Sequence, residues 1–310
     1  MVSFYKGLHI NEFVYLEGTK LINIRVKKKT VALAGASGLI GTYLSSNLNE
    51  YDLLKISRND LQLADADFAE KYQESDIVIN LSGAPVIRRW TKRYKKEILD
   101  SRISTTKKLG CIMEYNKDRE RLYLSASAIG IYNDEEIHTE DSAAWGEGFM
   151  AEVVGKWETE AQKIESPKTK VCILRTGIVL AVDGGMLAML LPFFRKGLGA
   201  WIGRGDQYFS WIHMEDFIRA LIFLIENRKR GIYNMTAPGY CTNKKFTKSL
   251  GQIIKRPVRF MLPKMLFSLL YGKGAAIVTG GQAVVPARLI KEGFHFNFQS
   301  VDMAIMDIVN

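Results

Sequence analysis

The sequence predicts an α/β protein with a doubly wound parallel sheet. Short apolar runs, each suited to a strand buried on both faces, alternate with longer amphipathic segments suited to helices. The first apolar run, Val31–Ala34, leads directly into Gly35, Gly38 and Gly41, and an apolar-periodic run follows them. This strand, glycine turn and helix at the head of an alternating pattern are typical of a Rossmann-type dinucleotide-binding domain.

Each of the three glycines has a physical role. Gly35 permits a tight turn after the strand, Gly38 lets a pyrophosphate approach the backbone, and Gly41 lets the helix pack closely on the sheet. Free N–H groups and the positive end of the helix dipole then face the phosphates. The pattern therefore predicts a dinucleotide cofactor.

The later elements follow the same alternation. We expect strands at 51–56, 76–81, 121–125, 170–180 and 231–237, and helices at 100–116 and 148–165. Residues 209–227 begin with Trp211, Ile212, His213 and Asp216 and continue as an amphipathic helix.

The end of the second strand bears on the choice of cofactor. Ser57 and Arg58 follow that strand directly, where NAD-specific folds place an acidic side chain against the ribose hydroxyls. A basic side chain suits a 2′-phosphate, so NADP(H) is favoured over NAD(H). The alternative is that Arg58 is an ordinary surface arginine.

Two segments interrupt the alternation and define the expected domains. Residues 29–182 with 209–237 form the NADP-binding domain, and residues 183–208 with 238–298 form a smaller mixed C-terminal lobe that closes over the crevice. Residues 1–28 form a weakly ordered extension containing a strand-like run, Leu21–Val26, and residues 299–310 form a C-terminal helix.

Composition indicates a globular protein of the cytoplasm. The chain has 310 residues, 47% of them hydrophobic and 25% charged, and no apolar run approaches the length of a membrane span. Its three cysteines, Cys111, Cys172 and Cys241, are far apart and have no metal-ligand spacing, so we expect a reducing compartment and no metal.

The net charge of +10 raises the question of nucleic-acid binding. Residues 88–108 hold nine basic side chains against Glu97 and Asp100, but no nucleic-acid motif accompanies them. A solvated helix face, or attraction of an anionic cofactor or substrate, explains this stretch better. We expect a small-molecule substrate, a monomer or homodimer, and no nucleic acid or membrane partner.

Several longer motifs occur together and in one order. They are RRWTKRYKKEILDSRISTT (88–106), SASAIGIY (125–132), LRTGIVLAVDGGMLAMLLPFFRKGLG (174–199), SWIHMEDFIRALIFLIEN (210–227) and GGQAVVPARLIKEGFHF (280–296). With the glycine fingerprint, they resemble the extended short-chain dehydrogenase/reductase superfamily, in its atypical epimerase-like subgroup. The resemblance covers roughly residues 30–308 and implies an NADP-binding Rossmann domain with a small C-terminal lobe.

The resemblance also implies site residues. The implied cofactor contacts are Gly35, Ser37, Gly38, Leu39, Ile40, Gly41, Ser57, Arg58, Leu81, Ser82, Gly83, Arg102, Arg175, Thr176 and Gly177. Ser127 matches the catalytic serine of the superfamily, and Arg102 stands where the superfamily has a structural asparagine. The implied substrate contacts are Tyr132, Arg204, Gln207 and Trp211.

The sequence departs from the superfamily at the proton donor. Ordinary members carry Tyr-x-x-x-Lys on the helix after the serine strand, and the corresponding positions here fall on Met150 and Val154. Neither side chain can carry a proton. Lys156 lies on another side of the helix, where we expect it to be exposed.

Each singled-out residue also has a structural interpretation. Ser127 faces either substrate or a buried backbone group. Arg102 either has a specific role at the site or is an ordinary surface residue, and packing explains Tyr132 more easily than catalysis does. His213 and Asp216 open a helix, where capping explains them better than catalysis.

Two functional classes remain open. The first is an NADPH-dependent oxidoreductase or epimerase acting on a carbonyl or sugar-nucleotide-like substrate. The second is a catalytically silent NADP(H)-binding regulatory protein. The missing Tyr and Lys favour this class, and the link of some relatives to cell division supports it.

Overall fold

The computed structural model describes residues 28–309. The expected extension, residues 1–28, therefore lies outside the described residues except for Lys28, and so does its strand-like run Leu21–Val26.

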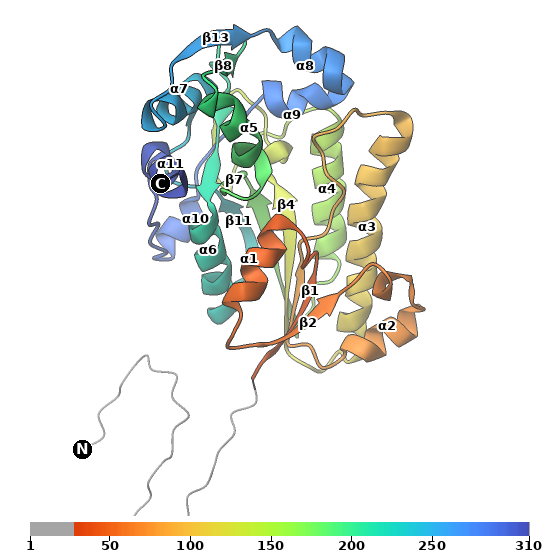
Figure 1. Cartoon of the computed structure of the whole chain (residues 1–310). Helices are drawn as coiled ribbons and strands as arrows, with labels where there is room; N and C mark the ends of the chain where they lie inside the picture. Colours follow the sequence, from red (N-terminus) through yellow and green to blue (C-terminus); the bar gives the residue numbers. More distant parts are fainter. Residues whose placement is uncertain (1–27, 310) are drawn as a thin grey trace, which may run out of the picture.

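A six-stranded, fully parallel sheet forms the centre of the molecule (Figure 1). Its strands lie in the order β2-β1-β3-β4-β6-β11. They are β1 (Thr30–Ala34), β2 (Asp52–Ile56), β3 (Ile77–Asn80), β4 (Arg121–Ala128), β6 (Thr169–Thr176) and β11 (Gly231–Met235). The chain reverses direction across the sheet between β1 and β3, and ligands of such sheets bind at the carboxyl ends of the strands at that point.

Helices cover both faces of the sheet (Figure 1). One face packs against α1 (Leu39–Asn47) and α6 (Met214–Glu226). The other packs against α2 (Asp65–Tyr72), α3 (Lys92–Tyr115) and α4 (Phe149–Gln162). Both predicted features, the doubly wound parallel sheet and the Rossmann-type arrangement, are confirmed.

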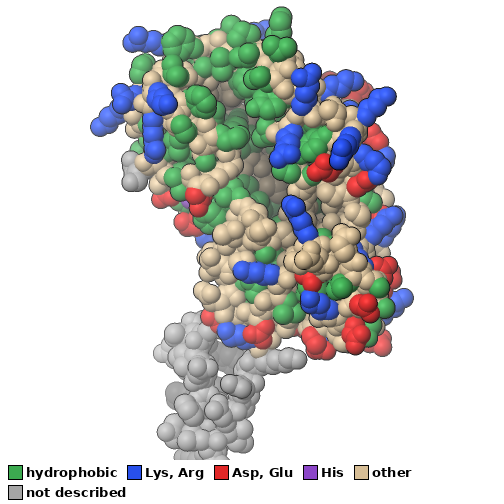
Figure 2. Space-filling view, turned by 45° about the vertical axis from the view of Figure 1, so that its right-hand side comes forward, with side chains coloured by type: hydrophobic (Ala, Val, Ile, Leu, Met, Phe, Trp, Pro, Cys, Tyr) green, Lys and Arg blue, Asp and Glu red, His purple; other side chains and the backbone are tan. Residues whose placement is uncertain are grey.

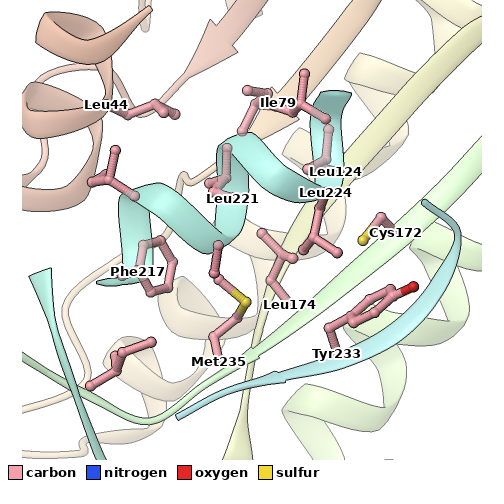
Figure 3. Packing of buried hydrophobic residues seen from close by; sticks show 14 of the residues in the cluster. Leu44, Ile79, Leu124, Cys172, Leu174, Phe217, Leu221, Leu224, Tyr233 and Met235 are labelled. Atoms are coloured by element: carbon pink, nitrogen blue, oxygen red, sulfur yellow. The ribbon is translucent and has the colours of Figure 1, made fainter. Parts of the chain in front are cut away.

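The pleat of the strands explains the two-sided core. Along β1, Val31 and Leu33 face the α1/α6 side, whereas Ala32 and Ala34 face the α2/α3/α4 side. Figure 3 shows Leu221 and Leu224 of α6 beside Leu124 of β4 and Leu174 of β6. Both faces of the sheet exclude water, so its strands read as nearly continuous apolar runs.

The remaining elements build the smaller mixed lobe and the connections. The strands pair two by two, as β7 (Ile178–Leu180) with β10 (Trp211–His213), β9 (Tyr208–Phe209) with β12 (Cys241–Thr242), β8 (Gly199–Ile202) with β13 (Val258–Leu262), and β5 (Ile137–His138) with β14 (Ala283–Val284). The helices are α5 (Gly185–Arg195), α7 (Asn243–Ile253), α8 (Lys264–Tyr271), α9 (Ala276–Thr279), α10 (Ala287–Lys291) and α11 (Val301–Val309). Single 3₁₀ turns are η1 (Asp60–Gln62), η2 (Ile129–Ile131) and η3 (Gly272–Ala275).

Two predicted elements have different bounds. The strand expected at 170–180 is two strands, because the chain bends at Gly177 and β7 leaves the central sheet to pair with β10. A Cβ at Gly177 would lie 2.7 Å from the Ser210 carbonyl oxygen, so the bend admits only glycine. The helix expected at 100–116 begins at Lys92, where the Thr91 side chain accepts a hydrogen bond from the Tyr94 N–H.

Of the helices in residues 28–309, none combines the length and apolar character that a membrane crossing requires.

The α1/α6 side of the core gives a stability test. Leu221 is fully buried, so Leu221→Ala should lower the free energy of unfolding by about 2–5 kcal/mol, through lost apolar burial and the cavity left behind. Leu54→Ala, at a 36% exposed position of β2, should change it by less than about 1 kcal/mol. Urea unfolding followed by circular dichroism measures both. Equal losses would contradict this assignment of the core.

Candidate functional site

The glycine turn lies at the reversal point of the sheet. Gly35 has φ +86°, and a Cβ there would lie 2.7 Å from the Leu81 carbonyl carbon after β3. A Cβ at Gly41 would lie 2.1 Å from the Gly35 carbonyl oxygen. Gly41 therefore packs the helix onto its own turn, a closer contact than the sheet packing expected for it. The turn brings the backbone of the β1–α1 and β3 loops together.

The first turn of α1 is left open to an anion. Gly38 is its N-cap, no side chain caps it, and no acidic residue lies in the first turn. No side chain at the N-terminus of α1 therefore bonds the free N–H groups of its first turn or offsets the positive end of the helix dipole. The backbone path fits a dinucleotide pyrophosphate, which is the group the glycine spacing predicts.

A second segment lies over the start of α1. The Tyr43 hydroxyl donates to the Asp183 carboxylate at 2.7 Å, and this bond raises the pKa of Tyr43 to about 12. A Cβ at Gly184 would lie 2.5 Å from Leu39 Cδ1. The loop before α5 is therefore pressed against the glycine turn.

The loop after β2 differs from the expectation in one respect. Arg58 is exposed, as a 2′-phosphate contact needs to be. The Ser57 hydroxyl, however, donates to Asp60, which also pairs with Lys71 at 2.6 Å. These bonds hold the pKa of Asp60 far below its usual range. Ser57 therefore shapes the loop. Its hydroxyl proton is used in the bond to Asp60 and is not free for a bond to the cofactor.

The loop after β3 is fixed by a buried amide. Asn80 donates to the Thr106 and Tyr123 hydroxyls, and its oxygen accepts from the backbone N–H and hydroxyl of Ser82. Trp157 of α4 donates to the same Thr106 hydroxyl. The expected contacts Leu81, Ser82 and Gly83 thus stand on a rigid base.

Arg102 lies directly behind that loop. Its guanidinium carbon is 5.1 Å from the Trp157 ring centroid, and a Cβ at Gly83 would lie 3.1 Å from the same carbon. It donates to the carbonyls of Ala84 and Ile98, and within residues 28–309 it has no carboxylate partner. Burial lowers the pKa of Arg102 to about 10. It is a half-buried cation with defined main-chain partners rather than a freely exposed surface residue.

The positions of the missing proton donor are apolar in three dimensions as well. Met150 and Val154 pack with Ala128, Ile129 and Ile131 in one cluster, and Val154 is 1% exposed. Lys156 is exposed and pairs with Glu152, as expected. The same cluster contains Tyr132, whose hydroxyl already bonds with Arg175 and Asn234, so Met150 and Val154 themselves provide no proton donor.

Ser127 has a partner that the sequence did not suggest. Its hydroxyl donates to the Glu158 carboxylate at 2.5 Å, and the serine is 4% exposed. Glu158 in turn forms a two-pronged pair with Arg175, at 2.8 and 2.7 Å. The expectation that Ser127 faces substrate or a backbone group is therefore wrong, because its proton goes to a buried carboxylate.

The Arg175 guanidinium is also committed within the protein. It donates to the Tyr132 hydroxyl at 2.8 Å, and that hydroxyl donates in turn toward the Asn234 side chain and the Thr139 carbonyl. The Glu158 carboxylate raises the pKa of Arg175, against the effect of burial. Of the three expected contacts at Arg175, Thr176 and Gly177, the Arg175 side chain is thus held by protein partners.

Glu158 was missed at the sequence level, although a signal existed. It follows Val154 by one helical turn and so lies on the apolar face of α4 with Trp157 and Ala161. A carboxylate on a buried face requires a buried cation, and Arg175 in an apolar strand offers one.

The four expected substrate contacts are not brought together as one site. Tyr132 and Trp211 are 1% and 0% exposed, and the Trp211 indole donates to the Gly239 carbonyl. The substrate contact expected at Trp211 is therefore wrong, and Tyr132 has the packing role favoured for it, because neither side chain has surface to offer a ligand. Arg204 is exposed and pairs with Asp206, while Gln207 Nε2 donates to Ile202 and its Oε1 is buried without a partner among residues 28–309.

The residues opening α6 have the structural roles favoured for them. His213 accepts the Glu215 N–H as N-cap. Asp216 is fully buried and accepts from the backbone N–H groups of Asn297 and Phe298. Both therefore fasten α6 to the chain that follows α10.

The surface is hollowed beside these elements. Figure 2 shows a cleft between the upper lobe, rich in hydrophobic side chains, and the part to its right that carries several Lys and Arg side chains. Within residues 28–309, no group of three His, Cys, Asp or Glu side chains is placed to hold a metal ion.

Comparison with known proteins gives two family matches. Residues 31–236 match the NAD dependent epimerase/dehydratase family, and residues 262–308 match a domain of unknown function, DUF1731. The chain is 32% identical to the chloroplastic epimerase family protein SDR39U1 homolog of Arabidopsis thaliana, over 90% of this chain and 86% of that one. It is 34% identical to the epimerase family protein ML0860 of Mycobacterium leprae, over 90% and 95%.

Comparison with solved structures gives proteins of the same fold. Human epimerase family protein SDR39U1, crystallised with NADPH, superposes with a TM-score of 0.82 at 28% identity, covering 90% of this chain and 98% of that one. The dTDP-4-dehydrorhamnose reductase of Bacillus anthracis, in complex with NADP, superposes at 0.74 with 14% identity over 91% and 98%, which is a likeness of fold alone.

The buried pair gives a second stability test. Glu158→Ala leaves the Arg175 guanidinium buried without its carboxylate, so the free energy of unfolding should fall by about 3–5 kcal/mol. Glu152→Ala, which removes an exposed pair on the same helix, should cost less than about 1 kcal/mol. Denaturant titration measures both variants. A Glu158→Ala loss as small as that of Glu152→Ala would show that the pair is not buried.

Proposed function

This chain belongs to the NAD-dependent epimerase/dehydratase family, and we propose that it binds NADP(H) at the β1/β3 crevice and acts as an oxidoreductase or epimerase. The observation that carries the proposal is the open glycine turn, because Gly35 and Gly41 admit no Cβ and the start of α1 has no side-chain cap. The human relative crystallised with NADPH supports this choice of cofactor.

The chain's own residues divide the work of holding the cofactor. Gly35, Ser37, Gly38, Leu39, Ile40 and Gly41 provide the backbone around the pyrophosphate. Arg58 provides the charge for a 2′-phosphate, and Leu81, Ser82 and Gly83 line the floor over Asn80. Thr176 and Gly177 border the crevice where β6 ends. When bound, NADP(H) supplies hydride chemistry.

The substrate class we propose is a carbonyl compound or a sugar-nucleotide-like molecule. Of the two expected catalytic residues we retain Arg102, because its cation has only main-chain acceptors within residues 28–309 and can stabilise negative charge. Ser127 acts as a positioning residue through Glu158. Arg204 and Gln207 remain the proposed contacts from the lobe.

A second candidate function is a catalytically silent NADP(H)-binding regulator, which one observation favours. The cluster of Ala128, Met150 and Val154 removes the proton donor and fills its place with apolar side chains. Native mass spectrometry of the purified full chain separates the candidates. A retained NADP(H) together with a metabolite supports the enzyme, NADP(H) alone supports the regulator, and binding of neither contradicts both.

Arg58 should set the cofactor preference. Arg58→Asp places a like charge beside the 2′-phosphate, so NADPH affinity should fall by about tenfold or more while NADH affinity changes little. Lys117→Asp, an exposed charge beyond the end of α3, is the matched control. Calorimetry with both nucleotides decides the matter. Equal affinity of the unaltered protein for NADH and NADPH would rule out this role.

Turnover of simple ketones should be very slow. A positioned general acid or base contributes about 10²–10⁴ in rate, and Met150 and Val154 provide none. Restoring Met150→Tyr with Val154→Lys should not rescue activity, because Val154 lies in an apolar cluster. Arg102→Ala should remove whatever turnover remains. Loss of NADPH absorbance measures each rate, and brisk turnover that survives Arg102→Ala would overturn this account.

A further inference from the structure

One face of the smaller lobe exposes large apolar side chains. In β13, Phe260 and Met261 are 54% and 53% exposed, and in α8, Met265, Leu269 and Leu270 are 80%, 73% and 57% exposed. No residue of α8 is buried. These five side chains, which we call the β13–α8 face, have no partner to cover them within the described chain.

The apolar surface continues beyond these two elements. β13 pairs with β8, and β8 contacts α5, whose Met189 and Phe193 are 54% and 59% exposed. Figure 2 shows hydrophobic side chains gathered over the upper lobe, with Lys and Arg at its margins and no Asp or Glu among them. Contiguous apolar surface of this kind marks an interaction site.

The charge pattern of the same part of the chain is one-sided. Between Glu226 and Glu292 there is no acidic residue, whereas thirteen are Lys or Arg. Those near the ends of this segment pair with acids elsewhere, as Lys229 does with Glu292 and Arg288 with Asp141. Within residues 28–309, those without a carboxylate partner in the middle of the segment are Lys244, Lys248, Lys255, Arg256, Arg259 and Lys273.

Three of these cations line one hollow. Lys248, Lys255 and Arg256 surround a shallow depression at the end of α7, next to the start of β13 at Val258. No acidic side chain lines it. The hollow therefore offers a seat for an anionic group at the edge of the apolar surface.

We propose that the β13–α8 face docks on an anionic membrane surface. Apolar side chains enter the boundary between headgroups and acyl chains, while the surrounding Lys and Arg side chains face lipid phosphates. This goes beyond the proposed function. It differs from the expectation of no membrane partner, which rested on the absence of a spanning segment and did not consider a surface contact.

The same charge argues against a second copy as the occupant. A two-fold contact through this face would place its unpaired cations against their own copies. An acidic partner protein would satisfy the charge, but the breadth of the apolar surface and its wide cationic margin suit a lipid surface better.

Vesicle flotation of the full-length protein tests the proposal. We expect binding to vesicles of phosphatidylcholine with phosphatidylglycerol and much weaker binding to phosphatidylcholine alone. The double change Met265→Ser with Leu269→Ser should lower the bound fraction by roughly tenfold without altering net charge. Leu63→Ser with Tyr115→Ser changes two exposed apolar residues, one just before α2 and one at the end of α3, and should leave binding unchanged. The helix α2 and the end of α3 lie at the opposite end of the molecule from β13 and α8 (Figure 1).

The controls separate this proposal from other effects. The melting temperature and NADPH affinity of the Met265/Leu269 variant should equal those of the unaltered protein. Vesicle binding is measured without cofactor, so its outcome can be interpreted even if the protein does not bind NADP(H). Vesicle binding that is unaffected by Met265→Ser with Leu269→Ser would be general electrostatic attraction and would overturn the proposal. An absence of vesicle binding would also overturn the proposal. If sedimentation velocity then showed self-association that the same variant abolishes, the face would instead be a contact between two copies of this chain.

Discussion

The buried ion pair between Glu158 and Arg175 is the interaction on which the candidate site depends. Their side chains are 5% and 3% exposed, and charges so far from water are tolerated only with full hydrogen bonding. Ser127 and Tyr132 supply the additional bonds, so β4, β6 and α4 are joined at the ends where the crevice begins. Side chains that hold this network cannot also meet a substrate, and the chemistry must be sought elsewhere.

The crevice itself is made almost entirely of backbone. Gly35 and Gly41 bring the β1–α1 turn within contact of the β3 loop, and Asn80 fixes that loop from beneath. Such a site recognises phosphate through N–H groups and a helix dipole, which need no charged side chain. This is why loss of the acid/base pair at Met150 and Val154 leaves the cofactor site intact: the two depend on different elements.

Positive charge is distributed unevenly, and the basic stretch 88–108 is one of two places where it gathers. There Lys96 pairs with Asp100 and Lys108 with Asp65, whereas the segment between Glu226 and Glu292 has no acid of its own. The smaller lobe therefore carries a second concentration of positive charge, beside its exposed apolar side chains. The cofactor crevice and the cationic apolar face thus belong to separate parts of the molecule.

The sequence by itself determined the parallel sheet, the glycine turn and the absent proton donor, because these follow from local periodicity and from residues adjacent in the chain. It placed Gly35, Gly38 and Gly41 between the first strand and its helix, and Met150 and Val154 on the helix that is α4. Only the tertiary structure decided the partners of Ser127, Tyr132 and Trp211, because burial and long-range hydrogen bonds depend on which strands become neighbours. Glu158 and Arg175 are separated along the chain and meet only when α4 packs on β6.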